Sequence, residues 1–292
     1  MFSRLVSFAK ATTASTIIAL NTLVGFTLMI PFALIKLALP LRPVRRFTDY
    51  FLNTIGETWV AVNGLWIDGI GHTRWRVSGA EQFKRQGWYL VSSNHQSWVD
   101  ILVLQKVFGG RIPLLKFFIK KELIYVPVIG LAWWALDFPF MSRKGGRASA
   151  AKDLETARKA CEKFRVVPTS VISFLEGTRF TPAKHGTQQS PYKHLLKPKT
   201  GGIGMALAVM GEQFDAMIDV TIVYPQGVPT FTDLICGRLS EVIVDVRQIQ
   251  IPQDLKVDSG TDANYRSRLQ SWVNGLWAEK DRRLEELAAR VQ

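Results

Sequence analysis

The sequence predicts an α/β fold in which a mostly parallel sheet is flanked by helices, with a helical segment in front of it. Three observations support this fold class. Short apolar runs alternate with helical stretches beyond residue 70, one long apolar segment lies within the first 40 residues, and no internal repeat or low-complexity linker interrupts the chain. Such alternation is typical of sheets whose strands run mostly parallel.

The alternating part supplies the expected strands and helices. Strands are expected at Thr73 to Val77, Tyr89 to Ser92, Val171 to Phe174, Val220 to Val223 and Glu241 to Val246. Helices are expected at Ile101 to Phe108, Arg147 to Phe164, Gly202 to Gly211 and Asp262 to Arg290. The last helix carries many charges, which favours a solvated helix that covers the sheet.

The segment from Ala14 to Leu39 is apolar and long enough to cross a bilayer. It is too long for the core of a signal peptide and lacks a convincing small-residue cleavage site, so we expect it to be retained. Asn21 and Pro31 inside it leave open a bent, half-inserted helical hairpin in place of a clean span. More positive charge follows the segment than precedes it, which favours a cytoplasmic position for the rest of the chain.

A second segment, Phe47 to Ile67, carries apolar and aromatic residues at helical spacing with polar residues between them. This pattern predicts an amphipathic helix. The helix either packs on the α/β domain or lies in a membrane interface, where Trp is favoured. The expected division is a membrane-anchoring helical segment over residues 1–70 and an α/β domain over residues 71–292.

Composition narrows the classes of partner. The 292 residues are 47% hydrophobic with a formal net charge of +13. A positive excess of this size favours an anionic surface, either nucleic acid or lipid headgroups, and the apolar N-terminal segment favours lipid. The two cysteines, Cys161 and Cys236, are far apart, which indicates a reducing compartment and no disulfide framework. The four His and the scattered acids show no metal-ligand spacing, so no metal is expected.

The first candidate site is the run Asn94-His95-Gln96-Ser97-Trp98-Val99-Asp100. In it, His95 and Asp100 straddle a turn between a strand and a helix. Residues five apart in one helix point about 140° apart around its axis, so a hydrogen bond between these two requires His95 to precede the helix. Ser97 is the expected N-cap, and Ser97 to Asp100 has the form of a capping box. Taken alone, the pattern also fits an ordinary helix start.

The second candidate site is Phe174-Leu175-Glu176-Gly177-Thr178-Arg179. At average composition, Glu-Gly-Thr-Arg is expected roughly 0.002 times by chance, against roughly 0.2 for His followed five residues later by Asp. The two motifs in this order resemble the glycerolipid acyltransferase family that includes the 1-acyl-glycerol-3-phosphate acyltransferases. The resemblance runs from about Trp88 to Pro225. It extends to Lys121-Glu122-Leu123, Phe140-Met141-Ser142-Arg143, Thr221-Ile222-Val223-Tyr224-Pro225 and, as in the branch with long-chain and lysocardiolipin acyltransferases, Trp133 to Phe138.

The resemblance implies roles for single residues. Arg179 matches the phosphate-binding Arg of the family, Lys121 matches the Lys ahead of Glu-Leu, and Arg143 closes a block in which Ser142 stands where an acid is common. This departure leaves the exact acceptor open. Glu176 is expected either to orient Arg179 or to bind neighbouring backbone. The substrate-binding residues expected on this basis are Lys121, Arg143, Glu176, Gly177, Thr178 and Arg179.

His95 and Asp100 are the expected catalytic pair. A neutral His can remove the proton from a hydroxyl as it attacks, and a carboxylate on the other ring nitrogen fixes the tautomer. The resemblance implies an acyl thioester donor, acyl-CoA or acyl carrier protein, as co-substrate and no further cofactor. No Ser or Cys lies in a nucleophile-elbow pattern, so we expect direct transfer without an acyl-enzyme. Backbone N–H groups after His95 or around Gly177 are both candidates to bind the oxyanion.

Two further segments have two interpretations each. Leu123 to Phe140 is apolar but is broken by two prolines, Gly130 and Asp137, which makes it a poor membrane span. It fits a core helix that enters a strand, or else a wall of an acyl-chain tunnel or a membrane-facing surface. The basic loop from Lys184 to Lys199 fits a solvated loop or a flap that faces a lipid headgroup.

The sequence thus predicts a membrane-anchored acyltransferase, in a bacterial inner membrane or its equivalent, with its catalytic domain facing the cytoplasm. The expected reaction moves a fatty acyl group to the free hydroxyl, at sn-2, of a lysophospholipid such as lysophosphatidic acid. Alternatives are a different acceptor, lysophosphatidylglycerol or lysocardiolipin, a non-catalytic protein that binds the membrane surface, and a nucleic-acid binder. His95 and Asp100 argue against the non-catalytic protein. The apolar N-terminus argues against the nucleic-acid binder, so membrane lipids and no nucleic acid are the expected partners.

Overall fold

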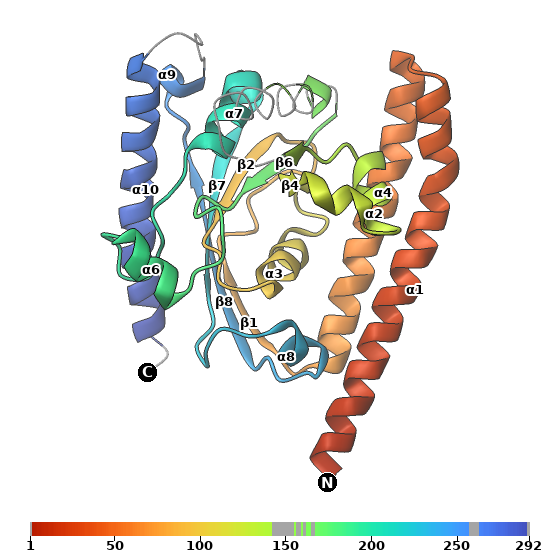
Figure 1. Cartoon of the computed structure of the whole chain (residues 1–292), viewed down its shortest axis with the longest axis horizontal. Coiled ribbons are helices and arrows are strands. Elements are labelled where there is room, and N and C mark those ends of the chain that lie inside the picture. Colours follow the sequence, from red (N-terminus) through yellow and green to blue (C-terminus); the bar gives the residue numbers. More distant parts are fainter. Residues whose placement is uncertain are drawn as a thin grey trace.

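The computed structural model has a six-stranded sheet between two layers of helices, with a long helical hairpin along one side (Figure 1). The structure describes residues 2–141, 155, 159, 162–164, 167–256 and 263–290. The strand order is β1-β8-β7-β2-β6-β3, and all neighbours are parallel except β7 and β8. The predicted fold class, α/β with a mostly parallel sheet flanked by helices, is confirmed.

The strands of this sheet are β1 (Arg74–Ser78), β2 (Tyr89–Ser93), β3 (Leu115–Phe117), β6 (Ser170–Ser173), β7 (Ala216–Val223) and β8 (Glu241–Ile249), and β4 (Ile119–Lys120) pairs separately with β5 (Phe140–Met141). The helices are α1 (Phe2–Ala38), α2 (Arg42–Ile70), α3 (Val99–Phe108), α4 (Ile129–Ala135), α6 (Pro182–Gln188), α7 (Gly201–Met210), α8 (Phe231–Ile235), α9 (Gln253–Lys256) and α10 (Ala263–Ala289). Two 3-10 turns lie at Lys121–Tyr125 and Gly211–Gln213.

All five strands expected from the sequence are present, and β7 and β8 are longer than expected. β3 was not expected, because its three residues are too few for an apolar run to stand out. The segment Leu123 to Phe140 contains a short helix, α4, that leads into β5. Leu131 and Trp134 of α4 are 52% and 44% exposed, so this is not the core helix of the first interpretation, and the tunnel wall or membrane-facing surface stays a prediction. The helix expected at Arg147 to Phe164 lies largely outside the described residues.

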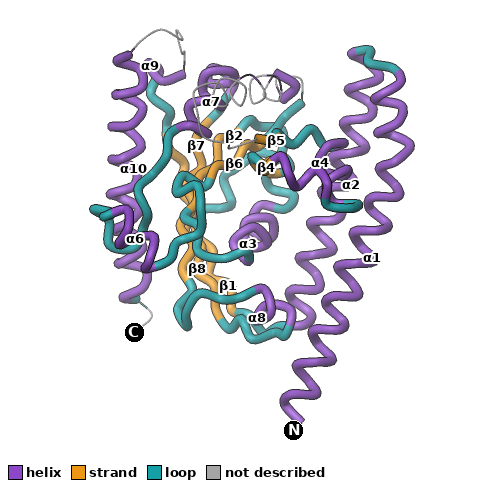
Figure 2. The backbone as a smooth tube through the Cα atoms, in the orientation of Figure 1, coloured by secondary structure: helices purple, strands orange, loops and turns teal. Residues whose placement is uncertain are grey.

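The central strands are buried on both faces because a different helical layer covers each face (Figure 2). In β2, Val91 packs into the cluster formed with α2 and α3, whereas the adjacent Leu90 packs into the cluster formed with α7 and α10. This alternation follows from the two-residue period of a strand. The parallel strands β2, β6 and β7 therefore all end at one edge of the sheet, where the turns that follow them meet.

α1 and α2 form the two arms of the hairpin. α1 continues without a break through Asn21 and Pro31, so a hairpin inside the first apolar segment is not formed. Asn21 instead donates a hydrogen bond to the side-chain oxygen of Asn63 on α2 (3.2 Å), which holds the arms together. α2 ends at Ile70 and buries Trp66 in the core under the sheet. The second segment thus packs on the domain, and the domain boundary at residue 70 stays a prediction.

The turn end of the hairpin is fixed to the domain by charge. Lys36 of α1 lies 2.5 Å from Asp137, and Arg45 of α2 and Lys163 lie 3.1 and 2.9 Å from the same carboxylate. Burial alone would raise the pKa of Asp137, but Lys36 and Lys163 hold it down at about 2. The carboxylate is therefore ionised, and it joins both arms to the segment that follows α4.

The outer face of α1 is apolar. Residues Arg4–Ala38 form the one helix of the described chain that is long and apolar enough to cross a membrane, and little of it is buried. Leu20, Leu23, Val24 and Leu28 are each more than half exposed. A contiguous apolar surface of this kind marks contact with a membrane or a partner, so membrane insertion of α1 remains the prediction for this helix.

Replacing Leu23 and Leu28 together by Glu should move much of the protein out of the membrane fraction, because a charged residue in the hydrocarbon core costs about 2.5–3.5 kcal/mol. The measurement is the share of protein that sediments with membranes. Val228→Glu, at a residue that is 53% exposed in a loop of the domain, is the control and should leave this share unchanged. Quantitative release of the wild type by high salt would show that α1 is not inserted, because apolar insertion does not depend on screened charge.

Candidate active site

His95 lies in the turn between β2 and α3, and its ring is held in one orientation. Nδ1 of His95 is 2.9 Å from Oδ2 of Asp100, in the first turn of α3, so the hydrogen bond expected from the sequence is present. An ionised carboxylate only accepts, which places the ring proton on Nδ1 and a lone pair on Nε2. The ring stacks on Phe174 with 3.9 Å between centroids, and the side chain is 13% exposed. Among the described residues, Nε2 makes no hydrogen bond and is free to act as a base.

The carboxylate of Asp100 is buried and surrounded by donors. Oδ2 also accepts the backbone N–H groups of Gln96 (2.6 Å) and Ser97 (2.8 Å), and Oδ1 accepts the hydroxyl of Tyr224 (2.6 Å). Burial and the charge of Asp100 raise the pKa of Tyr224 well above its usual range, so its hydroxyl stays protonated. These donors replace the water that a buried carboxylate loses, and they hold the carboxylate in place beside His95.

The start of α3 differs from the sequence prediction. The helix begins at Val99, with Trp98 and not Ser97 at the N-cap. One half of the expected capping box forms, because the Asp100 carboxylate accepts the N–H of Ser97. The other half does not, since the N–H of Asp100 donates to the carbonyl oxygen of Ser97 (3.3 Å). The Ser97 hydroxyl instead accepts the backbone N–H of Val99 (3.1 Å) and donates to the carbonyl oxygen of Pro229 (2.5 Å).

Glu176 joins the second motif to the first. It follows β6 and is fully buried, and its Oε1 accepts the backbone N–H of His95 at 2.8 Å while Oε2 accepts that of Leu196 at 3.0 Å. The backbone N–H of Phe180 donates to the carbonyl oxygen of His95 at 2.7 Å. Glu176 was expected either to orient Arg179 or to bind neighbouring backbone, and the structure shows it bound to backbone. Two turns whose bonded residues are 81 apart in sequence are thereby held in a fixed relative position.

The rest of the second motif faces outward. Gly177 has φ of +67°, and a Cβ there would lie 3.1 Å from the side chain of Lys199, so the turn requires glycine. The Thr178 hydroxyl accepts a hydrogen bond from Lys184 (2.8 Å). Arg179 is exposed, and its guanidinium lies over the ring of Trp98, 4.9 Å from the centroid. Trp98 belongs to the first motif, so the cation lies beside the turn that carries His95.

The remaining predicted site residues are not joined to this cluster. Lys121 is exposed at the start of a 3-10 turn, and no hydrogen bond among the described residues links it to either motif. Arg143 lies outside the described residues. Tyr224, Lys184 and Lys199 contact the site but were not assigned to it from the sequence. The sequence shows Tyr224 directly after an expected strand and the two lysines in the basic loop. The spacing of these residues along the chain does not indicate that they lie near His95.

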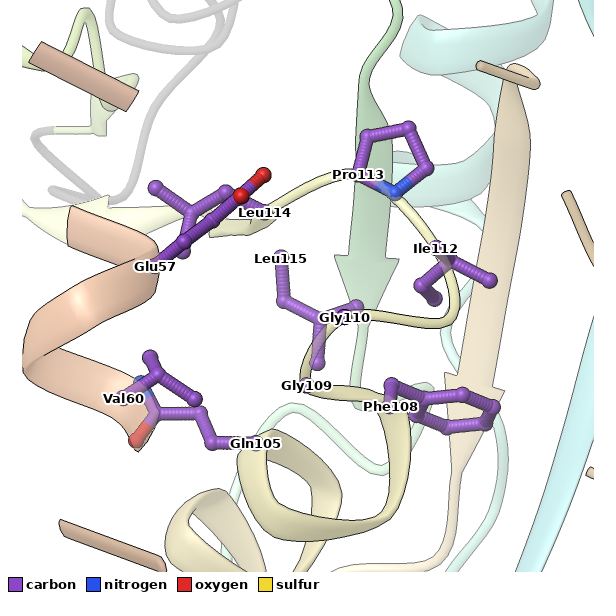
Figure 3. Close-up of a pocket in the computed structure, with 10 residues that line it drawn as sticks. All are labelled: Glu57, Val60, Gln105, Phe108, Gly109, Gly110, Ile112, Pro113, Leu114 and Leu115. Carbon is purple, nitrogen blue, oxygen red and sulfur yellow. The ribbon is translucent and has the colours of Figure 1, made fainter. Parts of the chain in front are cut away.

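The cavity shown in Figure 3 does not include His95, Asp100 or Glu176. Within the described part of the chain, no group of three or more His, Cys, Asp or Glu could hold a metal ion. The cavity lies between α2 and the loop after α3, lined by residues that include Glu57, Val60, Phe108 and Leu115. It is at the C-terminal end of α3, a helix about 15 Å long, whereas His95 precedes the N-terminal end.

Comparison with known proteins agrees with this geometry. A family model described as acyltransferase matches residues 74–225, just over half of the chain and the stretch that contains both motifs. The chain belongs to this acyltransferase family. The match begins at β1 and ends directly after Tyr224, so it covers the segments that carry His95, Glu176 and Tyr224.

Individual relatives and a solved structure are also similar to this acyltransferase. The chain is 29% identical over 216 residues to 1-acyl-sn-glycerol-3-phosphate acyltransferase 3 of Arabidopsis thaliana, covering 68% of this chain and 53% of the relative. It is 29% identical over 211 residues to 1-acyl-sn-glycerol-3-phosphate acyltransferase delta of Homo sapiens, covering 68% and 52%. The chain therefore spans about half the length of these relatives.

The crystal structure of the 1-acyl-sn-glycerophosphate (LPA) acyltransferase PlsC from Thermotoga maritima superimposes with a TM-score of 0.55. The alignment covers 96% of this chain and 98% of that chain, at 18% identity. At this level of identity the likeness concerns the fold. It extends over the helical hairpin as well as the sheet, because almost the whole of both chains is aligned.

Glu176→Gln should destabilise the acyltransferase by about 2 kcal/mol or more, because one amide cannot accept both backbone N–H groups and its NH2 would oppose one of them. Denaturant unfolding in detergent measures this loss. Glu81→Gln, at an exposed residue between β1 and β2, is the matched control and should unfold like the wild type. An unchanged midpoint for Glu176→Gln would mean that the carboxylate does not hold the two turns.

The stabilities of the wild type and of Glu176→Gln should depend differently on pH. Burial raises the pKa of Glu176 to about 7, although the N–H groups of His95 and Leu196 oppose the shift. Between the unfolded pKa of about 4.3 and about 7, the folded state holds more protons than the unfolded state, so stability falls as pH rises. The advantage of the wild type over Glu176→Gln should therefore be larger at pH 5 than at pH 7.5.

Proposed function

We propose that this protein transfers a fatty acyl group from an acyl thioester, acyl-CoA or acyl carrier protein, to the free sn-2 hydroxyl of a lysophospholipid such as lysophosphatidic acid. The observation that carries the proposal is the fixed His95–Asp100 pair, in a turn whose backbone is hydrogen-bonded to Glu176 of the turn that bears Arg179. Relatives named as 1-acyl-sn-glycerol-3-phosphate acyltransferases support the same reaction class.

The proposed chemistry is one direct transfer. Nε2 of His95 takes the proton of the acceptor hydroxyl as its oxygen attacks the thioester carbonyl carbon. Collapse of the tetrahedral intermediate breaks the carbon–sulfur bond and releases the thiolate, which receives the proton from His95. The imidazolium that exists between these steps is stabilised by Asp100, whose carboxylate accepts hydrogen bonds from Tyr224 and two backbone N–H groups.

The oxyanion of the intermediate requires N–H donors that are not already engaged. The N–H groups of Gln96 and Ser97 already donate to Asp100. In the turn after His95, these two donors are therefore not available to the oxyanion. Among the described residues, the backbone N–H groups of Trp98, Thr178 and Arg179 make no hydrogen bond. Two of these three lie in the turn after Gly177, which favours that turn as the oxyanion site.

Arg179 supplies the proposed contact with the acceptor phosphate. Its guanidinium is stacked on Trp98, and stacking of this kind fixes the plane of the group while its N–H edge stays available for two parallel contacts with phosphate. Lys121 and Arg143 remain proposed as further contacts, on the resemblance alone. The exposed apolar face of α1 supports a position at a membrane, and a bacterial inner membrane with the domain on the cytoplasmic side remains our proposal.

His95→Ala should lower the rate of acyl transfer by about 10²–10⁴-fold, the usual contribution of a general base, and leave folding and membrane association intact. Asp100→Asn should cost less but still orders of magnitude, because the amide no longer fixes the tautomer. Initial rates with oleoyl-CoA and lysophosphatidic acid are the measurement. His72→Ala, at an exposed histidine before β1, is the control; a His95→Ala variant that keeps more than about a tenth of the activity excludes the base role.

A further inference from the structure

Three cationic side chains lie in or next to the turn Glu176 to Arg179. Arg179 lies within it, and Lys184 donates to the Thr178 hydroxyl at 2.8 Å and to the carbonyl oxygen of Arg179 at 3.0 Å. Lys199 lies over Gly177, since a Cβ built on that glycine would be 3.1 Å from Cδ and 3.4 Å from Nζ of Lys199. Two of these cations come from the basic loop, which the catalytic chemistry described above does not use.

In the part of the chain that the structure describes, no carboxylate pairs with these three cations. Glu176 is the one acid in the turn, but it is fully buried and both of its oxygens accept backbone N–H groups. Within the described part of the chain, neither Lys199, Lys184 nor Arg179 forms an ion pair, whereas Lys193 of the same basic loop pairs with Glu285 at 2.6 Å. Unpaired cations held close together repel one another, which is tolerated where an anionic ligand binds.

Lys199 is held in place by the backbone. Its N–H donates to the carbonyl oxygen of Leu175 at 2.7 Å, and Leu196, three residues earlier, donates to Glu176. This segment is therefore fixed to the end of β6 in the same way as the His95 turn. α7 begins at Gly201, two residues later, and the N-terminus of a helix adds partial positive charge on that side.

We propose that Lys199, assisted by Lys184, completes with Arg179 a site for a phosphomonoester dianion, so that the enzyme selects acceptors with a terminal phosphate over phosphodiester lysolipids. A phosphomonoester carries about −1.5 to −2 charges at neutral pH, whereas a phosphodiester carries one. A second cation beside the guanidinium therefore attracts the doubly charged phosphomonoester more strongly than the singly charged phosphodiester. This inference rests on the acyl transfer proposed above and specifies its acceptor.

The test compares lysophosphatidic acid with lysophosphatidylglycerol of the same chain length, with one acyl donor and the full-length protein in detergent micelles. Wild type should have the higher kcat/KM for lysophosphatidic acid. Lys199→Gln should lower that value on the order of tenfold and lower the value for lysophosphatidylglycerol by less than about threefold. Lys197→Gln, at an exposed lysine two residues away in the same loop, is the matched control and should change neither.

Lowering the pH provides a second readout. The second proton of a phosphomonoester binds with a pKa of about 6, so the preference of the wild type for lysophosphatidic acid should shrink below that pH, and the Lys199→Gln variant should show a weaker dependence. An equal loss on both acceptors, or a loss confined to the KM of the acyl donor, would overturn the assignment of Lys199 to the acceptor phosphate.

Binding without the acyl donor separates this inference from the proposed reaction. Calorimetric titration with each lysolipid should give tighter binding of lysophosphatidic acid to the wild type and a loss of that difference in Lys199→Gln. A wild type that binds both lysolipids equally overturns the inference even if acyl transfer occurs. Selective binding without any transfer would instead contradict the proposed reaction and leave the phosphate site supported.

Discussion

A single buried carboxylate holds the site together. Glu176 accepts the backbone N–H of His95 and that of Leu196, and it belongs to the turn that carries Arg179. The base, the guanidinium and the basic loop come from three separate stretches of the chain, and this side chain contacts the backbone of two of them directly. A buried acid with two accepted N–H groups is stable only when both partners are in place, so the position of the base depends on the second motif.

The polarity of the sheet explains why this contact is possible. β2, β6 and β7 are parallel neighbours, so the turns after them leave the same edge and bring His95, Glu176 and Tyr224 together. Tyr224 then donates to Asp100, and the catalytic pair is supported from β7 as well as from β6. The helical hairpin lies outside this arrangement. It reaches the domain core through α2 and through Ala14 of α1, and it is fixed at its turn end by Asp137.

Much of this could be predicted from local sequence. The strand at Tyr89 is a short apolar run, and the five-residue spacing of His95 and Asp100 requires the turn that is found. Long-range partners could not be predicted in the same way. Whether Glu176 binds Arg179 or backbone depends on the distance between two turns that spacing does not determine.

The same limit applies to other elements. Lys199 lies 20 residues beyond Arg179 and reaches the site through a backbone hydrogen bond to Leu175. The bend that Asn21 and Pro31 left open does not form, and Asn21 has a partner on α2. β3 is too short to show a period of its own. In each case tertiary contact decides what local pattern left open.

The central claim is that this fold moves an acyl group directly onto a lysophospholipid hydroxyl. Lipid mass spectrometry after incubation of the purified protein with isotope-labelled oleoyl-CoA and a panel of lysophospholipids tests it most directly. The account predicts labelled diacyl product, most abundant as phosphatidic acid from lysophosphatidic acid, with no labelled acyl group on the protein itself. Labelled protein as an intermediate, or no labelled lipid with any lysophospholipid of the panel and either thioester donor, would contradict it.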